Sequence, residues 1–191
     1  MRMAQTRTSS SKSGSKAAPS RSKAASKPAS RANTAIDIQP KTRTSLVDLL
    51  SATMADNFDL YSQTKVAHWN VKGRDFMQLH LLFDQVAEMI EPFTDTLAER
   101  IALLGGIADG SVRGAAKASS IPEFPVTPAA GGPYLEALQE RWAQHAQSVR
   151  EAAGKAGEMG DPTTEDMFVE LSREVDQGLY FIESHLLGDE A

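Results

Sequence analysis

The sequence contains no cysteine and no run of apolar residues long enough to cross a membrane. The absence of cysteine excludes disulfides, thiolate metal sites and cysteine nucleophiles together. A membrane span needs about 18 or more consecutive apolar residues, and the start of the chain lacks the apolar segment of a signal peptide. These absences predict a soluble protein that is not secreted.

Acidic residues are almost absent from the first 43 positions. Asp37 stands there against ten Lys or Arg, a net charge of +9, whereas residues 44–191 carry a net charge of −14. The first 35 residues are mainly Ser, Ala, Lys, Arg, Thr and Pro, which bury too little apolar surface to offset the entropy of ordering. We predict a disordered basic tail over residues 1–43 and an acidic domain over residues 44–191. An organellar transit peptide also fits the Arg- and Ser-rich start, but no amphipathic period supports it.

Strand-like alternation is absent from the acidic domain, where apolar residues recur at steps of three and four. The pattern predicts a helix over residues 44–71, which begins with a capping box formed by Ser45 and Asp48. A second helix is predicted over residues 74–104. Pro92 lies inside it, but the apolar period continues unchanged across the proline, which favours one kinked helix over two separate helices.

A gap of about 27 residues follows before the next strong helical signal, and it is too long for a tight hairpin. We expect a crossover along the bundle with a short helix over residues 112–118. A third helix carries Pro133 in its first turn, and a fourth begins with Asp161 as N-cap and Pro162 at the first position, ending at Gly188. Four helices with one long crossover predict an all-α, ferritin-like four-helix bundle.

Four polar residues of the second helix, His80, Asp84, Asp95 and Glu99, share one face because the helix turns 100° per residue. They lie, however, at different positions along the helix axis. Asp84 and Asp95 lie about 16 Å apart along the axis, whereas metal ligands must converge to about 2 Å from one ion. No single copy of this helix can gather all four around one metal.

The same four residues are mirrored about a point in the middle of the helix. The residue numbers of His80 with Glu99, and of Asp84 with Asp95, both add up to 179. A two-fold axis at that point would bring His80 and Asp84 of one chain opposite Glu99 and Asp95 of a second, because an isologous interface pairs residue i with j and j with i. We therefore expect at least a dimer, with two identical metal sites split between subunits.

His68, at the end of the first helix, is the fifth candidate ligand, and it completes a set of two histidines and three carboxylates. Imidazole and carboxylate ligands suit iron, zinc or manganese, and this mixed set suits an iron pair that changes oxidation state. Taken singly, such a histidine is more often a packed core residue and such carboxylates a solvated face. The joint geometry favours the metal interpretation. The chain has no Glu-x-x-His, which argues against classical ferritins and di-iron oxygenases.

Four segments resemble the Dps family over about residues 40–188. They are His68-Trp-Asn-Val-Lys-Gly, Leu79-His80-x3-Asp84, Asp95-x3-Glu99-Arg-Ile-x-x-Leu-Gly-Gly, and Ala-Asp-Gly-x-Val-Arg before Ser120-Ile-Pro-Glu-Phe-Pro. The resemblance implies a hollow shell of twelve subunits with 23 symmetry in the bacterial cytoplasm, associated with the nucleoid. It also implies ferroxidase centres at two-fold interfaces, where Fe(II) is oxidised, preferably by hydrogen peroxide, and stored as ferric mineral that protects DNA during starvation and oxidative stress.

The resemblance also assigns roles to individual residues. Lys65 would lie beside the metal ligands, and Trp69 would intercept radicals, although Lys65 could pair with any carboxylate and Trp69 could simply pack the helix end. The expected metal ligands are His68, His80 and Asp84 of one subunit with Asp95 and Glu99 of its mate.

Other titratable residues lie on the last two long helices. His145 and His185 lack carboxylates at matching spacing, and we interpret them as structural or surface residues. Acidic residues near the turn between these helices match the iron-entry pore of the family, although helix capping and the helix dipole explain them equally well. These pore candidates are Glu158, Asp161, Glu165 and Asp166.

The basic tail is the candidate DNA-binding element, because an acidic shell repels DNA. Nine net charges on each subunit would give multivalent, salt-sensitive phosphate contacts without base reading, and the tail has no aromatic residue for stacking. A solubilising tail without a partner is the alternative. A nucleoid architectural protein with a vestigial or structural metal site is the alternative for the whole protein. The candidate DNA contacts are Arg2, Arg7, Lys12, Lys16, Arg21, Lys23, Lys27 and Arg31.

Overall fold

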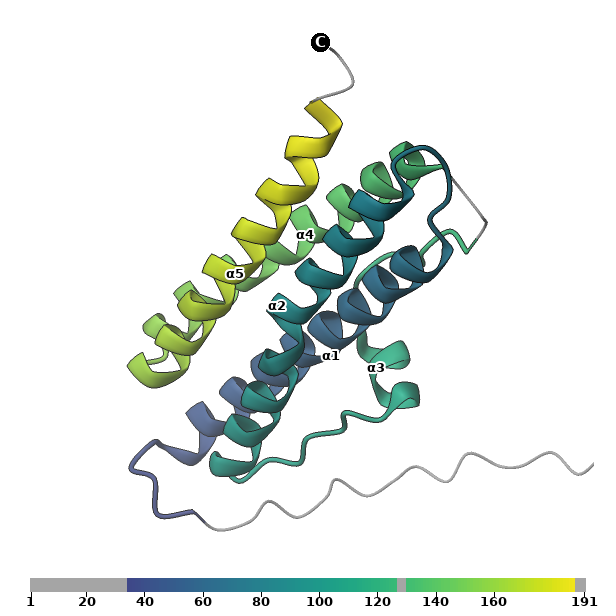
Figure 1. Ribbon diagram of the computed structural model, residues 1–191. Helices are drawn as coiled ribbons and strands as arrows, with labels where there is room; N and C mark the ends of the chain where they lie inside the picture. Colours follow the sequence, from purple (N-terminus) through teal and green to yellow (C-terminus); the bar gives the residue numbers. More distant parts are fainter. Residues whose placement is uncertain (1–33, 127–129, 188–191) are drawn as a thin grey trace, which may run out of the picture.

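Five helices make up the part of the chain that the structure describes. The computed structural model describes residues 34–126 and 130–187. Four long helices lie side by side in an elongated bundle, and the connection that carries a short helix runs along its outside (Figure 1). The predicted all-α, ferritin-like arrangement with one long crossover is confirmed. The helices are α1 (Pro40–Asn70), α2 (Phe76–Leu103), α3 (Val112–Ala118), α4 (Gly131–Glu158) and α5 (Pro162–Leu186).

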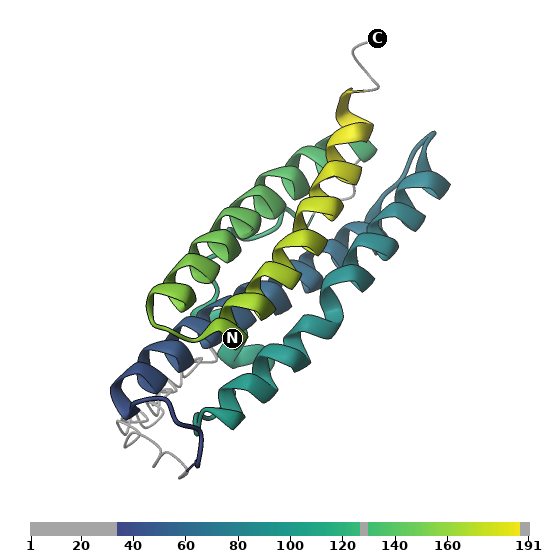
Figure 2. The same cartoon turned by 90° about the vertical axis from the view of Figure 1, so that its left-hand side faces the viewer.

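The bundle consists of two antiparallel hairpins, α1 with α2 and α4 with α5, which pack against each other (Figure 2). An isolated bridge joins Lys72, just after α1, to Ala130, just before α4. Helix α4 therefore begins at the end of the bundle where α1 ends, as the long crossover requires. Among the described residues, no helix is both long enough and apolar enough to span a membrane.

Helix α1 begins at Pro40, four residues before the predicted start. The predicted capping box is wrong, because Ser45 already lies inside the helix and its hydroxyl donates to the Lys41 carbonyl at 3.5 Å. Pro40 starts the helix instead, since its fixed φ suits the first turn and its missing N–H would have had no partner there. Helical structure thus reaches into the segment predicted as tail, and residues 1–33 lie outside the described residues.

Pro92 lies within α2, which continues as one helix from Phe76 to Leu103. The prediction of a single helix across the proline is confirmed. Asn57 of α1 contacts this region, donating to the Ile90 carbonyl at 2.8 Å and to the Thr94 hydroxyl at 3.0 Å. This buried amide fastens α1 to α2 beside the proline, where the helix lacks one of its own hydrogen bonds.

Buried polar side chains fasten the crossover to the bundle. Asp56, 4% exposed, accepts hydrogen bonds from the backbone N–H of Ser120 at 2.6 Å and from its hydroxyl at 2.9 Å. Arg141 donates to the Glu123 carbonyl at 2.6 Å and to the Pro122 carbonyl at 3.2 Å. These contacts pair backbone groups that the non-helical segment cannot pair itself. The short helix α3 spans the predicted residues, with Ser111 as N-cap.

The turn between α4 and α5 contains a buried ion pair. Asp161 caps α5 by accepting from the Thr164 N–H at 3.3 Å, and Arg100 of α2 donates to both of its carboxylate oxygens at 2.9 and 2.8 Å. Burial alone would raise the pKa of Asp161, but the hydrogen bonds from Thr164 and Arg100 outweigh it and hold the pKa below its usual value. The predicted N-cap and the Pro162 start are confirmed. Helix α5 ends at Leu186, and Gly188 lies outside the described residues.

Candidate metal centre

Two histidines face each other where α1 ends and α2 begins. Nδ1 of His68 lies 2.7 Å from the His80 carbonyl oxygen, and Nδ1 of His80 lies 2.9 Å from the His68 carbonyl oxygen. The rings stack with their centroids 3.7 Å apart. Because a carbonyl oxygen only accepts, both Nδ1 atoms carry the proton, and in the neutral rings the lone pairs lie on Nε2. This is the arrangement that orients histidine as a metal ligand.

A carboxylate and an ammonium group lie beside this histidine pair. Asp84 forms an ion pair with Lys65 of α1, and its Oδ1 lies 3.9 Å from Nδ1 of His68. The hydrogen bond from Lys65 lowers the pKa of Asp84 against the opposing effect of burial. The same hydrogen bond raises the pKa of Lys65. Asp84 is therefore ionised and oriented near the two histidines. Lys65 pairs with one of the predicted ligands, which fits both the predicted place beside the metal and the alternative of a simple ion pair, so its role remains a prediction.

Asp95 and Glu99 lie on the other half of α2 and are exposed. The structure does not bring them to the histidines of the same chain. Within the described residues, no three His, Cys, Asp or Glu side chains converge so as to hold a metal ion. One chain thus presents His68, His80 and Asp84 together, and the two remaining predicted ligands on a separate open surface.

Trp69 is 62% exposed, although it directly follows His68. The alternative that it packs the end of α1 is therefore not supported in the isolated chain. An exposed aromatic side chain beside the histidine pair is available to a second subunit or to reactive species formed there. Its predicted part in intercepting radicals remains a prediction.

The other two histidines occupy the places expected of structural residues. His145 is fully buried, and its Nε2 lies 3.3 Å from the Asn57 side-chain oxygen. Burial lowers the pKa of His145 from 6.5 to about 4. His185 is exposed on α5, and its Nδ1 donates to the Phe181 carbonyl at 2.9 Å. Neither histidine lies beside the candidate metal ligands.

The pore candidates separate into two groups. Glu158 and Asp166 are exposed and Glu165 is half-buried, so all three remain candidates. Asp161 is 2% exposed, and Arg100 and Thr164 occupy its carboxylate oxygens. The capping alternative therefore holds for Asp161, whose buried carboxylate is not available to line a pore.

The sequence interpretation missed Tyr61 and Glu91, which lie near the candidate metal ligands. Tyr61 of α1 and Glu91 of α2 share a hydrogen bond, and both line a cavity of about 500 Å³ with Asp95. Burial first, and the charge of Glu91 second, raise the pKa of the Tyr61 hydroxyl. The available signal was helical spacing, because Tyr61 lies one turn before Lys65 and Glu91 one turn before Asp95.

Comparisons with known proteins agree with this architecture. The Ferritin-like domain family matches residues 47–189. A curated protein of Agrobacterium fabrum, "DNA protection during starvation protein", is 35% identical over 153 residues, covering 80% of this chain and 94% of the relative. The solved structure of DpsC from Streptomyces coelicolor superposes with a TM-score of 0.79 at 30% identity, covering 84% of this chain and 94% of that one. An archaeal Dps homologue from Halobacterium salinarum gives a TM-score of 0.78 at 28% identity, covering 87% and 93%. The chain therefore belongs to the Dps family of ferritin-like proteins.

Proposed function

We propose that this protein oxidises Fe(II) at centres shared between two subunits and stores the ferric product inside a closed shell. Iron is the substrate and cargo. Hydrogen peroxide is the proposed preferred oxidant: two Fe(II) ions supply two electrons, the O–O bond breaks, and the oxygen leaves as hydroxide or water. Membership of the Dps family supports iron storage and DNA protection in general terms.

The observation that carries this proposal is the incomplete ligand set of one chain. His68, His80 and Asp84 lie close to one another without forming a complete ligand set, and the backbone contacts of both histidines use Nδ1 rather than Nε2. Asp95 and Glu99 lie on the same face of α2 but too far along the helix to join them. An antiparallel second copy of α2 would supply these two carboxylates at each of two identical sites, giving an oxygen and nitrogen set suited to iron.

Mixing subunits tests the shared centre. One variant combines His68→Ala with His80→Ala, and the other combines Asp95→Ala with Glu99→Ala. Each is expected to be inactive alone, and co-assembly is expected to restore peroxide-driven Fe(II) oxidation, because mixed interfaces contain one complete site. No recovery in shells that demonstrably contain both variants would falsify the shared centre.

We further propose a twelve-subunit shell that binds DNA without sequence preference through the basic tails, in association with the nucleoid. The tail residues lie outside the described residues, so this proposal depends on the charge contrast between tail and body. Deleting residues 2–35 stops short of Ile36, which packs against the core. Gel retardation of DNA should disappear while iron oxidation continues. Retardation that survives the deletion would refute the role of the tail.

A nucleoid architectural protein with a vestigial or structural metal site is the second candidate, favoured by the basic tail alone. The two candidates differ in one measurement. The ferroxidase proposal expects purified protein to consume Fe(II) and peroxide in a ratio of about two to one, as the electron balance requires. The architectural alternative expects no oxidation above the rate in protein-free buffer.

A further inference from the structure

All five acidic residues of α2 lie on one face of that helix. Asp84 is half-buried and the other four are exposed. At 100° per residue, Glu88 and Glu91 fall within the same arc of about 100° as the candidate ligands. The face therefore carries two further carboxylates in the middle of the helix, between Asp84 and Asp95. The acidic residues of α2 are Asp84, Glu88, Glu91, Asp95 and Glu99.

Positive charge does not balance these two further carboxylates within one chain. The hydrogen bond to Asp84 is the main cause that raises the pKa of Lys65, and the charge of Glu88 is the weakest of the causes that act on it. Glu91 accepts a hydrogen bond from the hydroxyl of Tyr61, which carries no charge. In the part of the chain that the structure describes, neither Glu88 nor Glu91 forms an ion pair. Their charges are therefore left to the solvent or to a second subunit.

The proposed pairing of two subunits brings these carboxylates together. Glu88 and Glu91 mirror each other about the point between Met89 and Ile90, as the candidate ligands do. Each lies about 2 Å from that point along the helix axis. Groups beside a two-fold axis lie close to their own copies at any crossing angle of the helices, because the axis carries each group only a short distance. The four carboxylates of Glu88 and Glu91 from both subunits therefore meet at the centre of the contact.

Like charges that meet in a contact oppose association unless opposite charge enters with them. Each shared centre would hold divalent cations on the same face, and an ion that binds the paired subunits better than single ones stabilises the pair by mass action. We propose that the four carboxylates of Glu88 and Glu91 weaken the pairing of metal-free subunits, and that metal ions at the two shared centres drive it. The inference rests on the proposed shared centres, and it makes the metal a regulator of assembly as well as a substrate.

Two centres lie in one contact, so their effects on pairing multiply. A metal ion present at about 100 times its dissociation constant multiplies the pairing constant by about 100 at each centre, and by about 10,000 at both. Neutral side chains in place of the four carboxylates remove the repulsion directly, so they strengthen the pairing of metal-free subunits. Salt acts in the same direction, because it screens repulsion between charges that solvent reaches.

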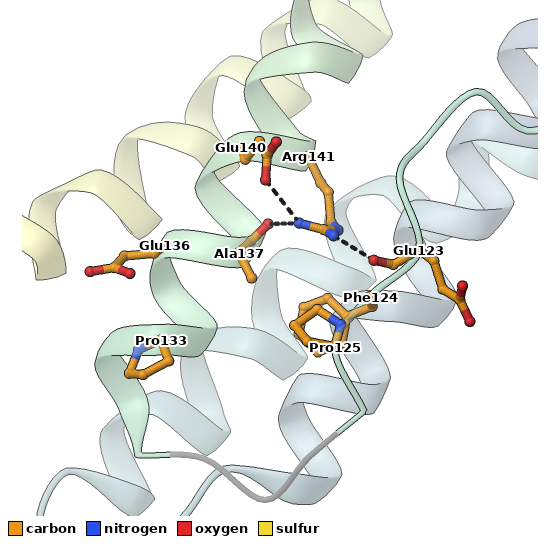
Figure 3. A pocket seen from close by; sticks show the side chains of 8 residues that line it. All are labelled: Glu123, Phe124, Pro125, Pro133, Glu136, Ala137, Glu140 and Arg141. Atoms are coloured by element: carbon orange, nitrogen blue, oxygen red, sulfur yellow. Dashed lines mark hydrogen bonds and ion pairs between the residues drawn. The ribbon is translucent and has the colours of Figure 1, made fainter.

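Sedimentation velocity of the full-length protein tests this proposal without iron oxidation. The test variant combines Glu88→Gln with Glu91→Gln, which keeps the size of both side chains and all five proposed ligands. The control variant combines Glu123→Gln with Glu136→Gln, which removes equal charge from the crossover and α4. Figure 3 shows these two carboxylates on opposite sides of a cavity there. Each protein is diluted with a chelator or with Co(II), a redox-silent probe, in urea too weak to change the helical circular dichroism.

The expected result is a difference in the concentration at which the subunits separate. Co(II) should lower that concentration severalfold or more for the wild type, and the chelated test variant should stay assembled where the chelated wild type and control separate. Equal separation of chelated wild type and test variant, an equal gain in both variants, or no effect of Co(II) would overturn the proposal. If the wild type still oxidises Fe(II) at shared centres, such a result refutes this inference alone. Failure of the mixed subunits to recover oxidation refutes the shared centre, and this inference with it.

Discussion

The bundle contains two kinds of buried or half-buried histidine, and their surroundings differ in one decisive respect. His68 and His80 each use Nδ1 on a backbone carbonyl, so that contact does not occupy Nε2, and the carboxylate of Asp84 lies 3.9 Å from Nδ1 of His68. His145 uses Nε2 on Asn57, and among the described residues its buried Nδ1 has no partner. The difference teaches that residue type alone does not make a ligand. The free nitrogen must face a place where carboxylates and a metal ion can come together.

The largest contrast is expected from removing each kind of histidine. His68→Ala with His80→Ala should lower the rate of Fe(II) oxidation by at least about 100-fold. Replacing a residue that only orients a metal ligand already lowers metal affinity or activity by about 10- to 100-fold, and loss of the ligands themselves should cost more. His145→Ala should leave oxidation unchanged but lower the free energy of unfolding by about 2 kcal/mol through a cavity and an unpaired Asn57. Stopped-flow absorbance and chemical denaturation measure the two effects. The comparison fails if His145→Ala abolishes oxidation in shells that remain folded.

The second contrast lies within α2, where Asp84 is half-buried beside the histidines and Asp95 and Glu99 are exposed on the other half of the helix. Asp95→Ala with Glu99→Ala should abolish oxidation as completely as the histidine variant, because these groups complete the proposed centre of the second subunit. The free energy of unfolding should change by no more than about 0.5 kcal/mol, as is usual for exposed positions. The control is Asp48→Ala, an exposed carboxylate at the far end of α1. Normal oxidation by the double variant would contradict the assignment.

The third contrast concerns pH. Burial lowers the pKa of His145 from 6.5 to about 4, so the unfolded chain binds a proton that the folded chain rejects between these values. The contribution of neutral His145 is complete above pH 6.5 and is lost as the pH falls toward 4, by about 3 kcal/mol over the full range. Denaturation at fixed protein concentration should show a smaller loss in His145→Gln, in which the titrating group is absent. Identical curves for the two proteins would show that His145 does not contribute.

The sequence predicted the fold and the separation of the ligands better than it predicted the local contacts. Helical periodicity gave the four long helices, because it reflects burial along the whole length of each element. The start of α1 at Pro40 was missed, since a capping box and a first-turn proline are competing local signals and spacing cannot rank them. Asp161 was predicted both as an N-cap and as a pore candidate, and the sequence could not choose between them because its partner Arg100 lies 61 residues away. Such a pairing follows from packing rather than from local pattern.

The smallest effect is expected at Lys65, which pairs with the proposed ligand Asp84 but is not itself a proposed ligand. Its ammonium orients Asp84 and lowers the pKa of that carboxyl, so Lys65→Met should weaken Co(II) binding, measured by calorimetry with this redox-silent probe, by about tenfold. Removing a cation also reduces repulsion toward the metal, which opposes this loss. Stronger Co(II) binding by Lys65→Met would mean that repulsion outweighs orientation, and that Lys65 restrains metal binding instead of preparing the site. The control is Lys72→Met, which removes an exposed cation near the same helix end without touching Asp84.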